Sequence, residues 1–355
     1  MKKKIGVIYG GRSTEHEVSI ESARTVVKLL SQAGYEVSPI YVPQHGAWRL
    51  ASPETGSGKK GGKIEPSFEK ERFMLDGAPL ELDAVFPLIH GSTGEDGVLQ
   101  GFLELLGLPY VGSGVLASAA SMDKVLSKNI ARDRGLPVLP HVEIAGRDKS
   151  RVAAGIRAAG DLGFPLFVKP VQLGSSVGVT KVKTFAELPG AVRRAFRFDS
   201  RVMIEKGVDR AREIVCGVLG SHLDAASSAA GEVRPKGKHE FYDYEAKYLD
   251  NNGMDFLAPA PLSGRTALKI RGFAAEIFKA AGCHGMARVD FLMDPIKETD
   301  FYFCEINTIP GFTSHSLYPS LWKATGLDPV KLAGRLVKLA FERRRAMAGL
   351  KTVRI

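Results

Sequence analysis

Two short runs near the C-terminus have the composition of a metal site. Arg288-Val289-Asp290 and Glu305-Ile306-Asn307 each place two polar residues around one apolar residue. Residues two apart on a strand face the same side, so a hairpin across residues 294–300 would bring the four polar side chains together. Carboxylate and amide oxygens are ligands that Mg²⁺ accepts while it keeps waters and phosphate oxygens. The same alternation is typical of any half-exposed hairpin, so the pattern alone leaves both interpretations open.

A second group of residues could hold a phosphate. Lys169 ends an apolar run and is followed by a loop that contains Gly174-Ser175-Ser176. Backbone N–H groups of such a loop can cradle phosphate, and a lysine at its base supplies a positive charge. The loop is not a P-loop, because no GKS or GKT follows a strand at the required spacing. A glycine loop beside a lysine is also typical of an ordinary turn.

Two further runs place acids next to glycine turns. Glu15 follows Gly10-Gly11-Arg12-Ser13 in the first turn of an expected helix. It either complements the helix dipole or grips an ammonium group. The run from His90 to Gly97 is rich in glycine and contains Glu95 and Asp96. Its glycines would let the backbone approach a ligand, and its acids could equally cap the next helix.

The elements that carry these runs alternate between strands and helices in the first third of the chain, which is typical of a parallel α/β sheet. There we expect strands at residues 4–9, 35–41 and 84–89 and a helix at 18–33. Residues 52–73, rich in Gly, Lys, Ser and Glu, are expected to form a mobile insertion without chemistry. Further along we expect helices at 122–134 and 265–281, strands at 166–169, 201–205 and 213–219, and a long loop at 231–259.

Length and composition limit the class of protein. The chain has 355 residues, 44% hydrophobic and 25% charged, and suits two or three domains. No apolar stretch approaches the ~20 residues that span a bilayer, and the N-terminal apolar run is too short for a signal peptide. We therefore expect a cytoplasmic protein that does not bind a membrane. The three cysteines lack CxxC spacing and are expected to be buried, reduced thiols.

The formal net charge of +10 is dispersed along the chain. No nucleic-acid recognition motif accompanies it, so we do not expect nucleic acid as a partner. A positive field would instead steer anionic substrates into a cleft.

Taken together, these runs resemble the D-alanine–D-alanine ligases of the ATP-grasp superfamily over nearly the whole chain. The resemblance implies an α/β (α+β) ATP-grasp fold with ATP held between the central and C-terminal domains. The domains it implies are an N-terminal first-substrate domain at 1–113, a central domain at 114–205, and a C-terminal domain at 206–355 with the metal site and a mobile loop. The motifs that carry the resemblance are Gly10 to Ser19, the His90 run, Met122-Asp123-Lys124, Lys169-Pro170 with Gly174-Ser175-Ser176, Phe241 to Tyr248, Arg288-Val289-Asp290, and Glu305 to Thr308 with Pro310-Gly311.

The resemblance also assigns roles to single residues. The phosphate-contacting lysines would be Lys124, Lys169 and Lys247, and the acids near adenine and ribose Glu205 and Glu213. The ligands of two Mg²⁺ ions, with Mn²⁺ as an alternative metal, would be Asp290, Glu305 and Asn307. Glu15 and His90 would hold the first substrate, with Ser175 bonded between Glu15 and Tyr248. Arg288 and the Gly311 N–H would stabilise the oxyanion, and Ser316 and the Leu317 N–H would bind the second carboxylate.

The implied activity is the ATP-dependent ligation of two D-alanines through D-alanyl phosphate, for peptidoglycan precursor synthesis, by a homodimer. One alternative is an ATP-grasp ligase that joins D-alanine to another acceptor, such as D-lactate or D-serine. An inactive nucleotide sensor is another, but the matching metal and phosphate positions are all filled. Tyr248 stands where the D-lactate-adding relatives carry histidine, which favours an amine as the nucleophile.

Overall fold

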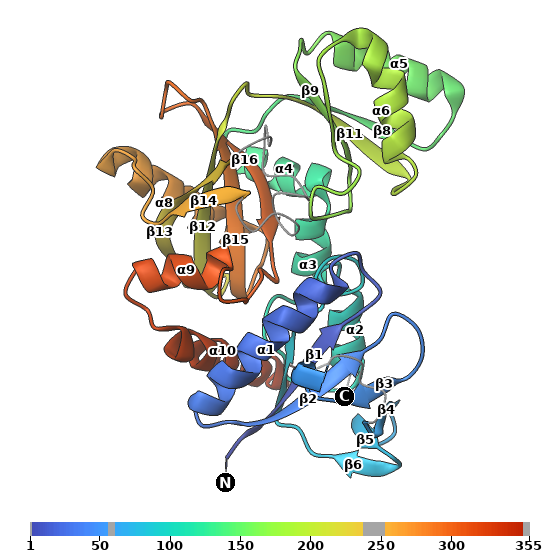
Figure 1. The fold of residues 1–355 in the computed structure, drawn as a ribbon, viewed down its shortest axis with the longest axis vertical. Coiled ribbons are helices and arrows are strands. Elements are labelled where there is room, and N and C mark those ends of the chain that lie inside the picture. The colour runs from blue at the N-terminus through green and yellow to red at the C-terminus, as the bar shows by residue number, and fades with distance from the viewer. Residues whose placement is uncertain (1, 56–60, 237–252, 351–355) are drawn as a thin grey trace.

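The computed structural model of the protein describes residues 2–55, 61–236 and 253–350, and its strands form three sheets (Figure 1). Of the phosphate and metal residues expected from the sequence, Lys169 lies on the second sheet, Asp290, Glu305 and Asn307 lie on the third, and Lys124 begins a helix, α4 (Lys124–Asp133). Lys247 and Tyr248, together with the whole expected loop from Phe241 to Tyr248, lie outside the described residues.

The first sheet has the strand order β6-β5-β4-β3-β2-β1-β7, in which β1 pairs in parallel with β2 and β7. The predicted parallel α/β arrangement is therefore confirmed for β2, β1 and β7, the three strands at one end of this sheet. The strands are β1 (Lys4–Gly10), β2 (Glu36–Val42), β3 (Trp48–Leu50), β4 (Lys63–Ser67), β5 (Arg72–Leu75), β6 (Ala78–Leu80) and β7 (Ala84–Pro87). The helical elements in this part are α1 (His16–Gln32), η1 (Pro53–Thr55) and α2 (Val98–Leu105).

The prediction of an unstructured insertion at 52–73 is wrong for residues 61–73. These residues extend the first sheet by the antiparallel pair β4 and β5. Their apolar side chains explain why: Ile64 and Phe73 are buried, and the Phe73 ring lies 5.9 Å from the rings of both Trp48 and Phe102. A few apolar residues at strand spacing were enough to anchor a hairpin whose other residues are polar.

The second sheet has the order β10-β9-β11-β8, and α5 and α6 pack on it. Ile156 of α5 and Leu188 of α6 share a core with Val168 of β9 and Ile204 of β11. The elements are β8 (His141–Ala145), α5 (Lys149–Gly160), β9 (Leu166–Pro170), β10 (Thr180–Val182), η2 (Phe185–Glu187), α6 (Leu188–Ala195) and β11 (Arg201–Lys206).

The third sheet is antiparallel and has the order β14-β13-β12-β15-β16. Its strands are β12 (Arg212–Gly220), β13 (Ala225–Pro235), β14 (Met254–Leu257), β15 (Gly285–Met293) and β16 (Phe301–Asn307). The helices beside it are α8 (Gly264–Ala280), α9 (Leu317–Ala324) and the C-terminal α10 (Pro329–Ala348). The long loop expected at 231–259 is wrong at both ends, because β13 runs on to Pro235 and β14 begins at Met254.

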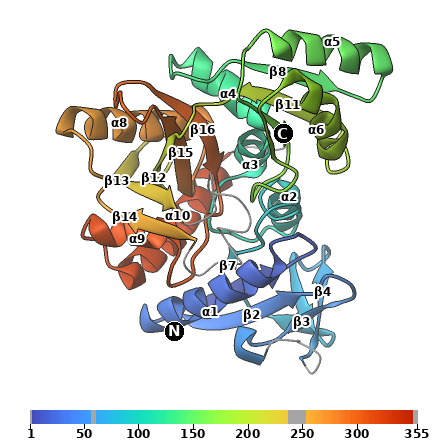
Figure 2. The same cartoon turned by 45° about the horizontal axis from the view of Figure 1, so that its top comes forward.

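Two short helices connect the first sheet to the others. α3 (Val115–Met122) and α4 (Lys124–Asp133) lie between the three sheets in both cartoon views (Figure 2). Ala117 and Ala131 contribute to the core of the third sheet. α10 returns from the chain end to pack on α1, and its Leu336 shares a core with Ile20. The first and last parts of the chain are thus joined by a common core.

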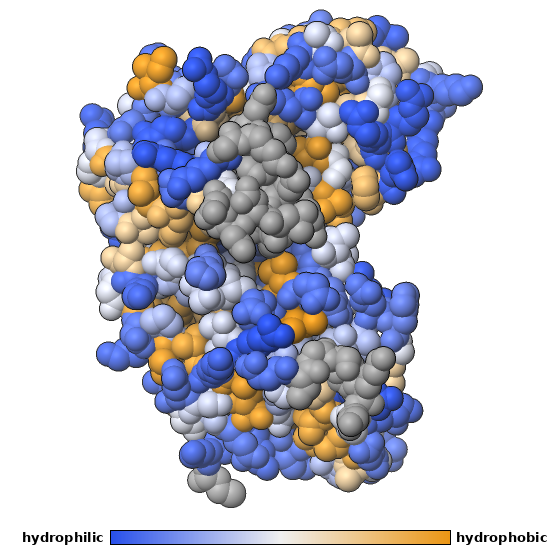
Figure 3. Space-filling view, in the orientation of Figure 1, coloured by the Kyte–Doolittle hydropathy of each residue, from blue (hydrophilic) through white to orange (hydrophobic). Residues whose placement is uncertain are grey.

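The surface shows hydrophobic residues scattered among hydrophilic ones, with a recess between the part that carries α5 and α6 and the part that carries the first sheet (Figure 3). No helix in the described ranges is both long enough and apolar enough to cross a membrane.

Candidate active site

Two cavities meet at the hairpin of β15 and β16. The larger has a volume of about 660 Å³ and the smaller about 120 Å³. Lys124, Arg288, Glu305 and Leu317 line both of them. The two cavities are therefore neighbouring compartments of one site, with these residues at their boundary.

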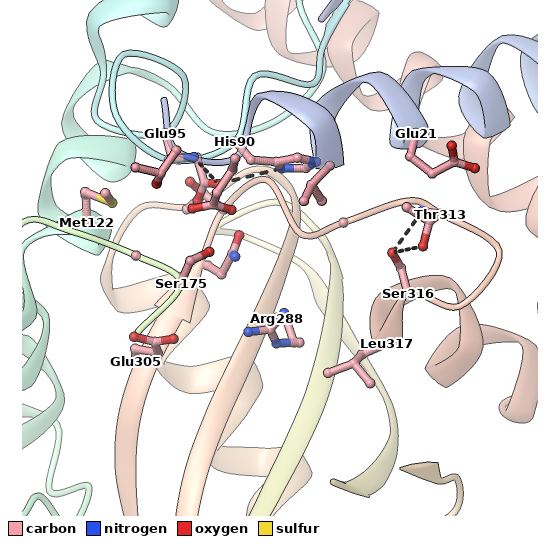
Figure 4. A pocket seen from close by; sticks show the side chains of 18 of the residues that line it. Glu21, His90, Glu95, Met122, Ser175, Arg288, Glu305, Thr313, Ser316 and Leu317 are labelled. Carbon is pink, nitrogen blue, oxygen red and sulfur yellow. Dashed lines mark hydrogen bonds and ion pairs between the residues drawn. The ribbon is translucent and has the colours of Figure 1, made fainter. Parts of the chain in front are cut away.

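Most of the predicted site residues line these cavities. Those around the larger one are Glu15, His90, Lys124, Ser175, Arg288, Glu305, Asn307, Gly311, Ser316 and Leu317. Those around the smaller one are Lys124, Lys169, Glu213, Arg288, Asp290, Glu305 and Leu317. Glu205 is buried and lines neither of these cavities, and the predictions for Lys247 and Tyr248 fall on residues outside the described ranges. Figure 4 shows Ser175, Arg288 and Glu305 facing the same space.

The predicted hairpin of polar residues is confirmed. Arg288 pairs with Asn307, and Asp290 pairs with Glu305, across β15 and β16. The Arg288 guanidinium donates two bonds of 2.7 Å to the two carboxylate oxygens of Asp290. This bidentate pair holds the Asp290 carboxylate in place from the same strand.

The donor set of this hairpin fits Mg²⁺. Asp290, Glu305 and Asn307 offer two carboxylates and one amide oxygen, which are hard ligands that leave coordination positions to waters and phosphates. Lys124 Nζ lies 3.6 Å from Glu305 Oε2, close enough to bring a phosphate toward the same hairpin. Asn307 Oδ1 also accepts the Ile309 N–H at 3.0 Å, which fixes the side chain. Among the described residues we find no cluster of three or more His, Cys, Asp or Glu that could hold a metal ion.

Glu205 sits between two lysines. Its carboxylate oxygens lie 2.6 Å from Lys128 Nζ and 2.6 Å from Lys169 Nζ, and all three side chains are buried. Burial raises the pKa of Glu205, but the charges of Lys128 and Lys169 outweigh it and lower that pKa to about 2. Two cations around one anion leave a net positive charge beside the smaller cavity. That charge suits the phosphate contact predicted for Lys169.

The loop after β9 has an unusual backbone. Ser175 and Ser176 have φ angles of 53° and 57°, in the left-handed region that residues other than glycine rarely adopt. Strained conformations of this kind cluster at ligand sites, where the surrounding structure holds them. The observation agrees with the predicted phosphate cradle.

Glu15 is enclosed by backbone from two distant loops. It is buried at the N-terminal end of α1. A Cβ at Gly91 would lie 3.0 Å from Glu15 Oε1, and one at Gly174 would lie 3.4 Å from it. Gly91 has a φ of 72°, so a side chain there would add backbone strain to the crowding. The two glycines thus let both loops close on the carboxylate that is predicted to hold an ammonium group.

His90 forms a buried acid–base cluster with Glu95. His90 Nδ1 lies 3.8 Å from Glu95 Oε1 and 2.9 Å from the Ile309 carbonyl oxygen, to which it donates. Burial lowers the pKa of His90, but bonding to Glu95 and the charges of Glu95 and Glu15 outweigh it and raise that pKa. Glu15, His90 and Glu95 line the same cavity, and the two carboxylates favour the protonated form of His90.

The segment after β16 forms the far wall of the larger cavity. A Cβ at Gly311 would lie 2.8 Å from Ser316 Oγ, so the chain passes too close for a side chain at this position. Ser316 Oγ accepts the Thr313 N–H at 2.8 Å and lies 2.9 Å from Thr313 Oγ1 (Figure 4). Leu317 begins α9, and the N–H groups of a helix N-terminus favour an anion.

The three cysteines form no disulfide bond, as expected from their spacing. Cys216 and Cys283 are buried, as expected, and burial raises their pKa values to about 12 and about 11. Cys304 differs from the expectation, because it is partly exposed and lines the smaller cavity.

Two buried residues that bond to the site or to the segments around it were not predicted from the sequence. Lys128 lies one helical turn after Lys124, on the same face of α4, and this spacing of four was the available signal. Ser22 lies three residues after Ser19, and two serines on the buried face of a helix were the signal there. Both side chains are fully buried and both contact elements far away in sequence.

The fold and the site define an ATP-grasp enzyme of the carboxylate–amine ligase class. The family model of the D-ala D-ala ligase N-terminus matches residues 4–113, and that of the C-terminus matches residues 130–338. The chain therefore belongs to the D-alanine–D-alanine ligase family, as the sequence resemblance predicted.

Similar proteins cover nearly the whole chain. The D-alanine–D-alanine ligase of Thermoanaerobacter sp. (strain X514) is 44% identical over 96% of this chain and 97% of its own. The solved D-alanine–D-alanine ligase of Coxiella burnetii is 37% identical, with a TM-score of 0.85 over 98% of this chain and 96% of that one. The VanG D-Ala:D-Ser ligase of Enterococcus faecalis is 34% identical, with a TM-score of 0.84 over 96% and 100%. The predicted ATP-grasp fold is thereby confirmed.

Proposed function

We propose that this chain joins two D-alanines into D-alanyl-D-alanine at the cost of ATP, a reaction that supplies a peptidoglycan precursor. The observation that carries the proposal is the shared boundary of the two cavities. Lys124, Arg288 and Glu305 lie where the compartment with Lys169 and Glu213 meets the compartment with Glu15. A phosphoryl group bound on one side would there reach a carboxylate bound on the other.

The first step activates the carboxylate of the first D-alanine. One of its oxygens bonds to the γ-phosphorus of ATP, and the bond to the bridging oxygen of ADP breaks. Lys124 and Lys169 hold the phosphates, Glu213 serves the adenine and ribose end, and Glu205 holds Lys169 in place beside it. Asp290, Glu305 and Asn307 would hold Mg²⁺, or Mn²⁺ in its place, and the bound metal would supply positive charge to offset that of the phosphates.

The second step forms the peptide bond. The neutral amine of the second D-alanine attacks the acyl carbon, the bond to phosphate breaks, and the nitrogen gives up a proton to the departing phosphate. Glu15 and His90 keep the first substrate oriented, and the sequence match assigns Ser175 a bond to Glu15 and one to Tyr248. Arg288 and the Gly311 N–H stabilise the oxyanion, while Ser316 and the Leu317 N–H hold the second carboxylate.

We also propose, from the family resemblance, the domain division, the location, the oligomeric state and the partners of the chain. They are the division into domains at 1–113, 114–205 and 206–355, a cytoplasmic location, a homodimer, and the absence of nucleic acid or membrane partners. The closing role of the loop that ends in Lys247 and Tyr248 rests on the sequence match alone.

The decisive assay follows phosphate release and dipeptide together. We expect purified protein with ATP and Mg²⁺ to release phosphate only when D-alanine is present, and mass spectrometry to find one D-alanyl-D-alanine per phosphate. L-alanine and excess EDTA serve as negative controls, and D-serine and D-lactate as competing acceptors. Phosphate release without dipeptide, or a mixed product in preference to D-alanyl-D-alanine, would refute the proposal.

A further inference from the structure

The short segment that carries Gly311 is held by side chains from distant parts of the chain. Its backbone turns between β16 and α9, and Ile309 and Phe312 are buried on either side of Gly311. Ile309 O accepts a bond from His90 Nδ1 at 2.9 Å. The Phe312 N–H donates to Ser22 Oγ at 3.2 Å. The two ends of the segment are thus bound to two side chains of the N-terminal part of the chain.

Those two side chains also contact each other. Ser22 Oγ lies 3.0 Å from His90 Nε2, and both side chains are buried. The contacts form a closed path that runs from the Phe312 N–H through Ser22 and His90 to the Ile309 carbonyl. Gly311 stands between the two bonded residues, Ile309 and Phe312, in the chain.

We propose that Ser22 is a positioning residue that aims the Gly311 N–H at the reacting acyl group through its bond to the neighbouring Phe312 N–H. The inference rests on the proposed function, because it gives the role of Gly311 its structural support. Ser22 is not among the residues that line the larger cavity, so it acts through the segment and not on the substrate.

The bond from Phe312 to Ser22 persists in either charge state of His90. Nδ1 must carry a hydrogen in both states, because the Ile309 carbonyl can only accept. When His90 is neutral, the Ser22 hydroxyl donates to Nε2 and accepts from Phe312. When His90 is protonated, Ser22 Oγ accepts from both Nε2–H and the Phe312 N–H, since a hydroxyl oxygen has two lone pairs.

Removal of the hydroxyl should affect the second step more than the first. Gly311 has no side chain to restrict its φ and ψ angles, so its backbone could turn once the Phe312 N–H lost its partner, and the Gly311 N–H would then point away from the acyl group. The proposed phosphate and metal residues that the structure describes lie on β9, β15, β16 and α4, and none of them bonds to Ser22 or to the Phe312 N–H. Phosphoryl transfer should therefore survive while attack on the acyl phosphate slows.

The test compares two rates in Ser22→Ala. Dipeptide formation reports both steps. Positional isotope exchange in ATP, measured with D-alanine and oxygen-18 in the β,γ bridge, reports reversible formation of the acyl phosphate. We expect dipeptide formation to fall about tenfold to hundredfold, as for a misplaced catalytic group. The ratio of exchange to dipeptide formation should rise about tenfold or more, with the KM for ATP within about twofold of wild type.

Ser19→Ala is the matched control. Ser19 is equally buried on α1, and its Oγ accepts the Gly10 N–H at 2.7 Å and donates to Leu88 O at 2.6 Å. It has the same chemistry as Ser22 but bonds only to the first sheet and the residues next to it. We expect Ser19→Ala to lower the unfolding temperature about as much as Ser22→Ala and to leave the exchange ratio at the wild-type value.

The outcomes separate the inference from the proposed function. An unchanged ratio in Ser22→Ala, whether or not both rates fall, would overturn the role of Ser22. If Ser22→Ala does not fold, Ser22→Cys keeps the size and a weak hydrogen-bonding atom, and it must raise the ratio or the inference fails. Wild-type protein that makes no dipeptide and shows no exchange with D-alanine would refute the proposed function itself.

Discussion

At the residue scale, the proposed metal ligands Asp290 and Glu305 give the most direct test. Asp290→Asn and Glu305→Gln keep the size of each side chain and remove a charge that Mg²⁺ requires. We expect each to lower kcat/KM at least about hundredfold, because the metal stabilises transition-state charge by several kcal/mol and 1.36 kcal/mol is tenfold. Steady-state rates over a Mg²⁺ titration would measure the loss.

Asp294→Asn is the control for that experiment. Asp294 lies in the turn of the same hairpin and accepts N–H bonds from Ile296 and Lys297 at 2.8 and 2.9 Å. Asp294→Asn removes a carboxylate from the hairpin at a position that lines neither cavity, so the activity of this variant should stay near that of wild type. Near-normal rates for Asp290→Asn or Glu305→Gln would contradict the metal assignment.

A second prediction at this scale concerns Tyr248, which lies outside the described residues and is judged from the sequence match. A neutral tyrosine would not repel the ammonium form of the second D-alanine, whereas a protonated histidine would. Tyr248→His should therefore raise the share of D-alanyl-D-lactate in a D-alanine and D-lactate competition, and more so as pH falls. The product ratio across about pH 6 to 9, a range around the unperturbed histidine pKa of about 6.5, measures this. Equal ratios for both proteins at every pH would show that the assignment is wrong.

At the scale of the elements, α4, β9 and β11 are tied together by Glu205. Glu205→Gln leaves Lys128 and Lys169 buried without their anion, and loss of one partner from a buried pair costs about 3–5 kcal/mol. We expect a clearly lower free energy of unfolding at pH 7, measured by urea denaturation.

The pH dependence of that difference has a defined sign. The pKa of Glu205 is lowered from 4.5 to about 2 in the folded protein, so its contribution is fully present above pH 4.5 and is lost as pH falls toward 2. The difference in free energy of unfolding between wild type and Glu205→Gln should therefore narrow between pH 5 and pH 3. This range brackets the pKa of about 4.3 that Glu205 regains in the unfolded chain. Glu143→Gln is the control, because Glu143 pairs with Arg201 at 2.6 Å in a more exposed position and should change stability by about 0–1 kcal/mol. A difference in free energy of unfolding that stays constant with pH would show that the loss of stability does not come from the Glu205 charge.

At the scale of the whole molecule, the smaller cavity, where we propose that the nucleotide binds, is lined by two sheets. Lys169 comes from the second sheet, and Glu213, Asp290 and Glu305 come from the third. A ligand that binds only the folded arrangement stabilises it by about 2.7 kcal/mol at 100 times its Kd. ATP with Mg²⁺ should thus raise the unfolding temperature of wild type in differential scanning fluorimetry.

Removal of the metal provides the comparison. Excess EDTA should cancel most of the rise that ATP causes in wild type, and Asp290→Asn should show little difference with or without EDTA. A metal-independent rise of the same size in both proteins would mean that ATP binds without the hairpin.

The chain by itself determined the local chemistry. Alternation around Val289 and Ile306 predicted a hairpin with polar residues on one face, and the glycine loops predicted close backbone approach, because both patterns depend only on residues near in sequence. The order of the motifs along the chain predicted the family, because each motif is a short run of neighbouring residues that can be recognised without the structure. The insertion at 52–73 was misjudged because its few apolar residues have meaning only once Trp48 and Phe102 lie against them.

Only the tertiary structure decided which partners these groups meet. Glu205 was expected near adenine and ribose, but its two lysines come from α4 and β9, and no periodicity encodes that meeting. Ser22 bonds to a residue 290 positions away, across two parts of the chain. Such contacts follow from how packed cores bring elements together, and a buried polar group must then find its partner wherever packing has placed one.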